Sequence, residues 1–381
     1  MSGALRVEAA ALPTGIGALR AELCTDEREF AALRSVWEPL YRSCGAATPF
    51  QSHAWLHSWW TSYGRPGRLR LVLVRDAAGG ELRAAAPLMR AGHTLPRLVP
   101  LGGAISDYGD VLLDDEHADR AATALAEALS AAARTALIDF REVRPGGAAE
   151  RVYERWRGPR LRLTDSICLE LPARPMDELL SRLPAGRAQR VRTKIRKLDQ
   201  LGVEHRFVRY DEVDSALRTM LELHRLQWQN RKVTTEHLRP RFLEHLTRSL
   251  GPMVRSGHAL VTEFRVGGEV LAVDVTLLSR GLAGTYLYGA HPRLRERKAE
   301  IFTMLLRACA DHVAGGECQV LSLLRGAEPH KSRWRPDAVV NQRLLLARRR
   351  TAPLLSAVAC EAAARSRGGE LVRGWREGRS T

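Results

Sequence analysis

The chain has 381 residues, 45% hydrophobic and 27% charged, which is typical of a globular protein with room for two domains. Charged residues interrupt its apolar runs well before the roughly 20 residues of a membrane span, so we expect a cytoplasmic protein with no membrane span. Six singly scattered cysteines argue against a disulfide framework and a zinc site, and we expect no metal. The net charge of +16 favours a polyanionic partner, although a solvated arginine-rich surface explains it equally well.

The first elements form an apolar, tryptophan-rich region. A loose lead-in ends near residue 20, and a helical apolar stripe follows over about 25–40. Trp55, Trp59 and Trp60 then lie within six residues. We interpret them as a helix face packed on a sheet, rather than as a platform on which a sugar or a base stacks.

The same order of elements then occurs twice. Strand-like segments flank a Gly-Gly-Glu turn at 79–81 and again at 267–269, an offset of 188 residues from Gly79 to Gly267. Paired glycines supply the positive φ that tight hairpin turns need. Each hairpin is followed by a third strand, a helix and a buried strand. In the first copy these lie at 97–101, 116–134 and 136–140, and in the second at 284–288, 298–314 and 320–324. The repeat predicts a duplicated α/β fold; an unduplicated α/β protein is the alternative.

A strongly basic helix is expected between the two copies, over about 186–202. Its apolar residues repeat at helical spacing, so one face packs on the protein. Arg190, Lys194 and Lys197 share another face, and three aligned cations suit a chain of phosphates. A solvated helix face fits the same pattern equally well.

The next helix, from 213 to about 231, combines an apolar stripe with polar residues. His224 and Trp228 lie on the stripe, so His224 is interpreted as a partly buried core histidine rather than a base. Arg225 and Arg231 are better placed to contact a ligand.

One strand of the second copy carries a single charge, Asp274, within the apolar segment 270–278. A carboxylate inside such a strand is costly unless it is paired. It is therefore a candidate proton acceptor for an amine nucleophile, with a salt bridge to an arginine as the alternative.

The densest polar cluster follows the last buried strand, where α/β proteins often place their sites. Residues 325–334 read Arg-Gly-Ala-Glu-Pro-His-Lys-Ser-Arg-Trp. Gly326 permits a close backbone approach, and Lys331 is suited to stabilising an oxyanion or holding a carboxylate. The cluster is therefore a candidate functional loop.

At this loop the sequence resembles the GNAT superfamily, and more narrowly the tandem-GNAT acetyltransferases of the cellulose-biosynthesis type, with a more distant similarity to Fem-type peptidyl transferases. That group has a Gly-x-Glu-x-Tyr-Lys-x-x-Trp-like pattern, which Gly326, Glu328, Lys331 and Trp334 match, while His330 replaces the tyrosine. The resemblance covers about residues 25–345. It implies an α/β fold of two tandem GNAT-like subdomains, each a mixed, mostly antiparallel sheet flanked by helices.

The implied layout is an N-terminal subdomain over 20–165, a C-terminal subdomain with the active site over 166–346, and a C-terminal helix and basic tail over 347–381. The resemblance also implies an N-acyltransferase that moves an acyl group from acyl-CoA, or another acyl-thioester, to an amine of a small molecule or peptide. The catalytic candidates are Lys331, Glu328 and Asp274. The donor-binding candidates are Tyr286, Tyr288, Arg295, Arg297 and Lys298. The acceptor-binding candidates are Asp107, Tyr108, Arg225, Trp228, Arg325, His330 and Trp334.

One departure from the family concerns the donor. GNAT enzymes usually cradle the coenzyme A diphosphate on a glycine-containing loop at a helix N-terminus, whereas the matching segment here, 293–300, has no glycine. Arg295, Arg297 and Lys298 would then hold phosphates through their side chains. The acidic segment 114–116 at the equivalent place in the first copy repels phosphate, so the second half is expected to bind the donor.

Two other functions remain open at this stage. The net charge and the basic helix favour an aminoacyl-tRNA donor, as in Fem-type enzymes, and a carrier protein is a further possible donor. The missing glycine loop favours a non-catalytic GNAT pair that binds nucleic acid or scaffolds a complex.

Overall fold

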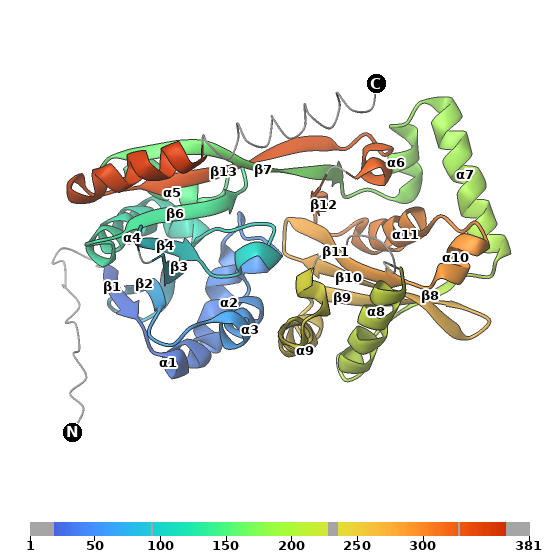
Figure 1. Cartoon of the computed structure of the whole chain (residues 1–381), viewed down its shortest axis with the longest axis horizontal. Helices are drawn as coiled ribbons and strands as arrows, with labels where there is room; N and C mark the ends of the chain where they lie inside the picture. The colour runs from blue at the N-terminus through green and yellow to red at the C-terminus, as the bar shows by residue number, and fades with distance from the viewer. Residues whose placement is uncertain (1–18, 93, 228–234, 327, 363–381) are drawn as a thin grey trace.

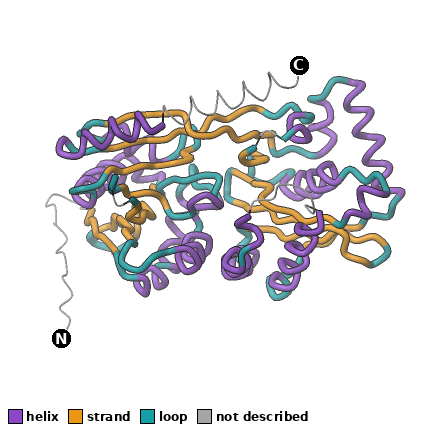
Figure 2. Tube along the Cα trace, viewed as in Figure 1, coloured by secondary structure: helices purple, strands orange, loops and turns teal. Residues whose placement is uncertain are grey.

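The computed structural model describes residues 19–92, 94–227, 235–326 and 328–362. Within these residues the strands form one 13-stranded sheet, in the order β1-β2-β3-β4-β6-β13-β7-β12-β11-β10-β9-β8, with β5 paired to β3. Helices pack around this sheet in both halves of the molecule (Figure 1, Figure 2). Among the described residues, no helix is both long and apolar enough to cross a membrane.

The first part of the chain supplies one half of the sheet. Its strands are β1 (Leu19–Cys24), β2 (Leu69–Asp76), β3 (Leu82–Ala91), β4 (Arg97–Pro100), β5 (Leu112–Leu113), β6 (Leu137–Val143) and β7 (Arg160–Pro172). Its helices are α1 (Glu27–Ala32), α2 (Arg34–Ser43), α3 (His53–Tyr63), α4 (Ala118–Ala132) and α5 (Ala148–Arg155).

The second part repeats this order. Its strands are β8 (Glu204–Phe207), β9 (Ala259–Val266), β10 (Glu269–Leu278), β11 (Leu282–Ala290), β12 (Val320–Arg325) and β13 (Asp337–Leu346). Its helices are α6 (Met176–Ser181), α7 (Ala185–Gln200), α8 (Val213–Gln227), α9 (Pro240–Arg255), α10 (Pro292–Glu296), α11 (Ile301–Val313) and α12 (Pro329–Ser332). Each element that the repeat predicts is present within a few residues of its expected bounds.

The sheet has the same strand order when it is followed inward from either edge. β1-β2-β3-β4-β6 corresponds to β8-β9-β10-β11-β12, and in both runs the last pair, β4·β6 or β11·β12, is parallel. A parallel pair needs a long crossover connection, and α4 and α11 are in the connecting segments. The two subdomains therefore share one topology.

The innermost strands are exchanged between the halves. β13, from the end of the chain, pairs with β6 of the first half, whereas β7 pairs with β12 of the second half. β7 and β13 also pair with each other and run across both halves (Figure 1). The predicted boundary near residue 165 falls inside β7, and the domain limits stay a prediction.

The two halves share irregularities as well as regular structure. Each hairpin has a register shift that leaves one extra residue, Arg83 in β3 and Leu271 in β10, and these positions are again 188 apart. β6 shifts register against β13, and β12 shifts register against β7. Beside these shifts, Glu142 in β6 and Leu324 in β12 both have a φ of 58°. Bulges and left-handed residues are specific local features, so their recurrence supports a duplication.

A single large core joins the halves. Trp55, Trp59 and Trp60 of α3 are buried, as expected for a packed helix face, although the sequence interpretation placed that face on a sheet and its chief partner is a helix. α3 packs against α9 of the other half, where the Ser58 hydroxyl donates to the His245 carbonyl oxygen at 2.8 Å. The two halves therefore form one packed unit.

Candidate active site

The sheet opens between β11 and β12. These parallel strands pair only over Leu282–Gly284 and Val320–Ser322, and beyond this point β11 has β10 as its remaining strand partner. The register between β10 and β11 shifts at Val275 and Thr276, and Tyr286 is the extra residue of this bulge. In the first half the corresponding strand β4 already ends at Pro100. The pair β4·β6 also opens early, after Leu98 and Ile138, but β4 has no register shift against β3, so among the described residues the bulge is a feature of the second half.

Helix α8 closes the far end of this opening. His224 Nδ1 lies 2.8 Å from the Tyr288 carbonyl oxygen, and Gln227 Oε1 accepts from the Ala290 N–H at 3.0 Å. Gly289 allows α8 to come this close, because a Cβ at that position would collide with the Met220 carbonyl. Burial lowers the pKa of His224. A neutral His224 that supports the strand fits its interpretation as a core histidine.

Asp274 is a buried carboxylate beside the opening. Its side chain is on β10, opposite Tyr288 in register, and the residue is only 4% exposed. Burial raises its pKa to about 7, although the hydrogen bond from the Thr276 hydroxyl, 3.0 Å long, acts in the opposite direction. No cation pairs with Asp274 among the residues that the structure describes. The carboxyl group therefore titrates near neutral pH, as a general base should.

Lys331 and Glu328 hold the loop after β12. The Lys331 ammonium donates to the Arg325 carbonyl oxygen at 2.8 Å and pairs with Glu328 at 2.9 Å. Burial acts to raise the pKa of Glu328, but the pairing with Lys331 outweighs it and the pKa is lowered. Gly326, with φ of 106°, leaves room for the Glu328 carboxylate. Glu328 is therefore a weaker base than Asp274, and Lys331 is engaged with its own loop.

The Tyr288 hydroxyl lies where these groups converge. Gln227 Nε2 donates to it at 3.2 Å. Burial raises the pKa of Tyr288, the negative charges of Asp274 and Glu328 add to the increase, and the charge of Arg295 opposes it. Three further residues proposed from sequence, Asp274, Arg295 and Glu328, thus each lie within electrostatic reach of the Tyr288 hydroxyl.

The N-terminus of α11 differs from a free anion-binding helix end. Glu300 is the N-cap, and its carboxylate accepts from the Thr303 N–H at 2.9 Å and from the Thr303 hydroxyl. Lys194 of α7 lies 3.7 Å from the same carboxylate. One backbone donor of this helix end, the Thr303 N–H, is therefore already in use, and the Glu300 carboxylate places a negative charge beside the others. Positive charge is available instead from the exposed side chains of Arg295, Arg297 and Lys298.

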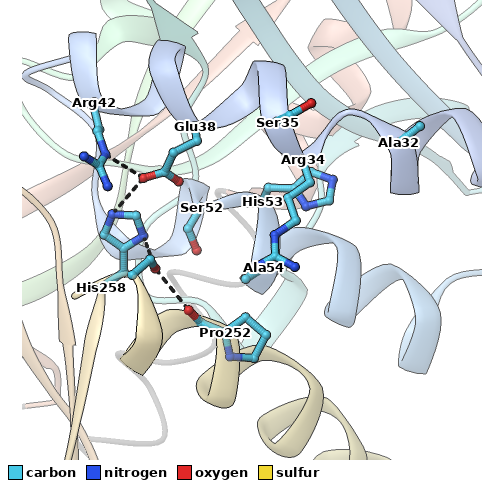
Figure 3. Close-up of a pocket in the computed structure, with 11 residues that line it drawn as sticks. Ala32, Arg34, Ser35, Glu38, Arg42, Ser52, His53, Ala54, Pro252 and His258 are labelled. Carbon is cyan, nitrogen blue, oxygen red and sulfur yellow. Dashed lines mark hydrogen bonds and ion pairs between the residues drawn. The ribbon is translucent and has the colours of Figure 1, made fainter. Parts of the chain in front are cut away.

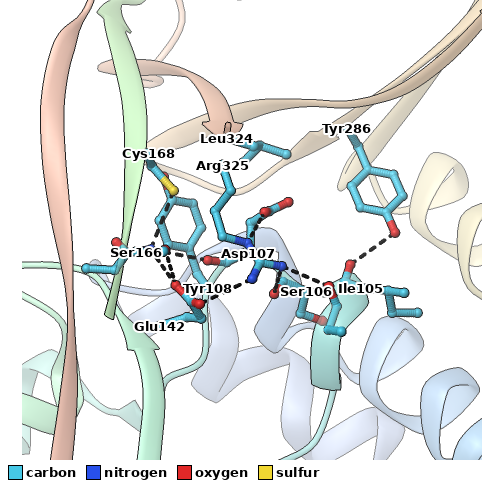
Figure 4. A network of polar contacts seen from close by, with 12 residues as sticks. Ile105, Ser106, Asp107, Tyr108, Glu142, Ser166, Cys168, Tyr286, Leu324 and Arg325 are labelled. Carbon is cyan, nitrogen blue, oxygen red and sulfur yellow. Dashed lines mark hydrogen bonds and ion pairs between the residues drawn. The ribbon is translucent and has the colours of Figure 1, made fainter. Parts of the chain in front are cut away.

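A second polar cluster joins the halves on the other side of β12 (Figure 4). The Arg325 guanidinium contacts Asp107 at 2.5 Å and Glu142 at 3.2 Å, and the Tyr108 hydroxyl lies 2.8 Å from Ser322 Oγ. The Tyr286 hydroxyl donates to a backbone carbonyl of the same loop, at residue 105, over 3.0 Å. A cavity of about 340 Å³ lies beside Arg325. Three residues proposed to bind the acceptor, Asp107, Tyr108 and Arg325, are thus assembled in one interface.

The remaining candidates are dispersed. Arg225 is exposed on α8, and Trp228 lies outside the described residues. The His330 ring packs 4.7 Å from the Phe302 ring, and Trp334 is buried in the core against α6 and α11. Sequence reasoning missed Gln227, Glu142 and Glu300. Of these, Glu300 had a local signal, because it precedes an apolar helical run and is followed three residues later by Thr303.

A larger cavity of about 480 Å³ lies between α2, the start of α3 and the end of α9 (Figure 3). Glu38 accepts from Arg42 at 2.7 Å and lies 3.4 Å from His258 at its wall. Burial lowers the pKa of His53, another lining residue, to about 4. No residue proposed from sequence as a site lines this cavity.

Comparison with known proteins agrees with this architecture. Residues 185–332 match the family model of the acetyltransferase (GNAT) domain, and no curated protein matches the chain. A conserved protein of unknown function from Bacteroides thetaiotaomicron is 12% identical, with a TM-score of 0.59 over 82% of this chain and 96% of that one. FemX is 11% identical, with a TM-score of 0.58 over 85% of this chain and 96% of the FemX chain. L-PGS from Bacillus licheniformis is 12% identical, with a TM-score of 0.53 over 88% of this chain and 96% of that one.

At these identities the solved structures are similar to the chain in fold alone. The family match covers α7 to α12, the segment that contains the opened strands, Asp274 and the loop after β12. The resemblance to the GNAT superfamily inferred from sequence is confirmed for residues 185–332, which match the family model of the GNAT acetyltransferase domain.

Proposed function

We propose that the protein is an N-acyltransferase that moves an acyl group from an acyl-thioester to an amine of a small molecule or peptide. Acyl-CoA is the first donor to test. The observation that carries the proposal is the opening between β11 and β12, with a bulge at Tyr286 and a carboxyl group of pKa about 7, Asp274, next to it. The first half has no equivalent of the carboxyl group, since Ala86 occupies the position of Asp274, 188 residues earlier.

The chemistry assigns separate roles to these residues. The amine nitrogen attacks the thioester carbonyl, a C–N bond forms, the C–S bond breaks, and the thiol leaves with a proton. Asp274 accepts the proton of the attacking amine. Backbone N–H groups at the Tyr286 bulge stabilise the oxyanion, because a bulge leaves backbone groups unpaired by the neighbouring strand. Lys331 acts as a positioning residue that holds the loop after β12.

The charges around the opening support a phosphorylated donor. Arg295, Arg297 and Lys298 would hold its phosphate through side chains, since Glu300 already caps α11. The interface cluster around Arg325 supports an acceptor site, with the cavity beside it large enough for a small amine-bearing group.

The test follows thiol release from acetyl-CoA in the presence of a panel of amines, with Asp274→Asn as the control. General-base catalysis typically contributes about 10²–10⁴-fold, so the variant should lose a comparable fraction of kcat. Release that is equal in the wild type and the variant contradicts the role of Asp274. Absence of release from every thioester contradicts the proposed reaction.

An aminoacyl-tRNA donor is the second candidate. It is supported by the run of exposed cations on α7, which suits the phosphates of a nucleic acid. Thermal shift and filter binding with tRNA at increasing salt concentration test it. Salt-sensitive binding of tRNA without stabilisation by a thioester favours this candidate over the first.

A further inference from the structure

The cap on α11 restricts what kind of thioester suits this site. Coenzyme A carries a diphosphate, which a helix N-terminus binds when its N–H groups are free. Here the Glu300 carboxylate already accepts from Thr303, and it would lie next to the incoming phosphates with the same sign of charge. The helix end therefore already holds a carboxylate, which lies 3.7 Å from Lys194 and whose charge opposes the binding of a diphosphate.

Unpaired cations surround this closed end instead. We define the basic rim as a set of exposed or half-exposed cations on α7, on α10 and in the turn after α10, namely Arg190, Arg192, Lys197, Arg295, Arg297 and Lys298. None of them forms an ion pair with another described residue. The two elements adjoin, because Leu198 of α7 and Leu294 of α10 share one apolar cluster, and Figure 1 shows α7 beside α10. The rim is therefore carried by two adjoining elements, with the exposed acid Glu296 among its cations.

The rim is larger than a small donor requires. The rim cations of α7 run from Arg190 to Lys197, which is about 10 Å at 1.5 Å per residue. The cations of α10 and of the turn after it extend the rim further, so a diphosphate covers only part of it. Charges spread over such a distance act mainly by steering an oppositely charged macromolecule and fixing its orientation. The rim also reaches the reaction site, since the charge of Arg295 acts on the Tyr288 hydroxyl.

We infer that the donor thioester is carried on the phosphopantetheine arm of an acidic carrier protein, which docks on the basic rim and inserts its arm between β11 and β12. This inference rests on the proposed acyl transfer. A phosphopantetheine arm has a single phosphate and no adenosine diphosphate, so it does not need the helix end that Glu300 occupies. An RNA-borne donor would use the same cations, so an aminoacyl-tRNA is included among the donors tested.

The first experiment compares three acetyl donors in the same amine acylation assay: acetyl-pantetheine, acetyl-CoA and a purified acidic acyl carrier protein loaded with an acetyl group. The test variant is R190E/R192E/K197E. The matched control, R28E/R65E/R134E, makes the same change of net charge on exposed arginines of the first half. We expect the highest kcat/KM with the carrier protein, a loss of at least tenfold in the test variant, and no loss in the control or with acetyl-pantetheine.

The outcomes separate the inference from the proposed function. If acetyl-pantetheine is a substrate but the carrier protein is no better than acetyl-CoA, or the test variant matches its control, the carrier inference fails and acyl transfer stands. If an aminoacyl-tRNA supports turnover that the test variant abolishes, the rim binds RNA and the inference is also overturned. If no thioester reacts, both the proposed function and the inference fail.

A second variant examines the closed helix end directly. Glu300→Ser removes the charge but leaves a hydroxyl that still caps the Thr303 N–H, so α11 keeps its N-cap. We expect KM for acetyl-CoA to fall by about three- to tenfold, as a charge effect at a helix terminus allows, while KM for the carrier protein stays the same. Glu296→Ser, on the adjacent α10, is the control for charge alone. An unchanged KM for acetyl-CoA means that Glu300 does not select the donor.

Discussion

Replacing Asp274 with Asn should make the protein more stable at alkaline pH. In the folded protein, burial holds the pKa of this carboxyl group at about 7, against an ordinary value of 3.8. A raised folded pKa means that the folded state favours the protonated form. The stability that this group contributes is present below the unfolded pKa and is lost as the pH rises through about 7.

The size of the effect follows from the difference between the two pKa values. A shift of about 3 units corresponds to about 4 kcal/mol of unfolding free energy that the wild type loses between pH 4 and pH 8. Asparagine has the same shape and cannot ionise, but burying its amide costs about 1–2 kcal/mol if one polar group lacks a partner. The variant should therefore exceed the wild type by about 2–3 kcal/mol at pH 8.5, while it loses acyl transfer.

Urea denaturation at pH 5.5 and pH 8.5 measures this difference. The matched control is Asp139→Asn in the first half, because Asp139 is equally buried but makes two hydrogen bonds with the Arg343 guanidinium, at 2.7 and 2.6 Å. Breaking that pair should cost about 3–5 kcal/mol at both pH values. An Asp274→Asn variant that is no more stable than the wild type at pH 8.5 would refute the reasoning, since it would mean that the carboxylate is satisfied in the fold.

Three further outcomes are expected. The kcat/KM of acyl transfer should rise with pH and level off above about 7, as Asp274 loses its proton; a rate that is flat from pH 5 to pH 9 assigns the base elsewhere. Arg325→Met leaves the Asp107 and Glu142 carboxylates without their cation at the interface. Urea denaturation should then give an unfolding free energy lower by about 3 kcal/mol, whereas a decrease below about 1 kcal/mol means that water already screens the cluster. Tyr288→Phe removes the acceptor of the Gln227 hydrogen bond and should cost about 1 kcal/mol; an additional loss in kcat would show that the hydroxyl contacts the reacting groups.

Local sequence patterns predicted the elements of this fold well. The Gly-Gly-Glu hairpins, the alternating strands and the two crossover helices depend on nearby residues, and the repeat fixed their order. Asp274 was also identifiable, because a single charge in an apolar strand stands out whatever surrounds it. Its lack of a cationic partner depends on which side chains the fold brings near, and the sequence does not encode that locally.

Long-range placement accounts for what was missed. No pattern in residues 337–346 indicates that this strand pairs with β6, since pairing partners are chosen by the topology and not by the strand itself. Gln227 supports β11 across 63 residues of sequence, and Glu142 meets Arg325 across 183. Tyr286 was assigned to the donor site, but its hydroxyl group donates to the Ile105 carbonyl oxygen of the other half.

The exchange of β13 and β7 ties the order of synthesis to the order of folding. While the chain is being made, β6 leaves the ribosome long before β13, its antiparallel neighbour, which starts at Asp337. The newly made first half therefore has a bare sheet edge, open to pairing with other chains, until the last strand arrives. Closure of the first half is thus the final step of assembly, and it waits for translation of the second.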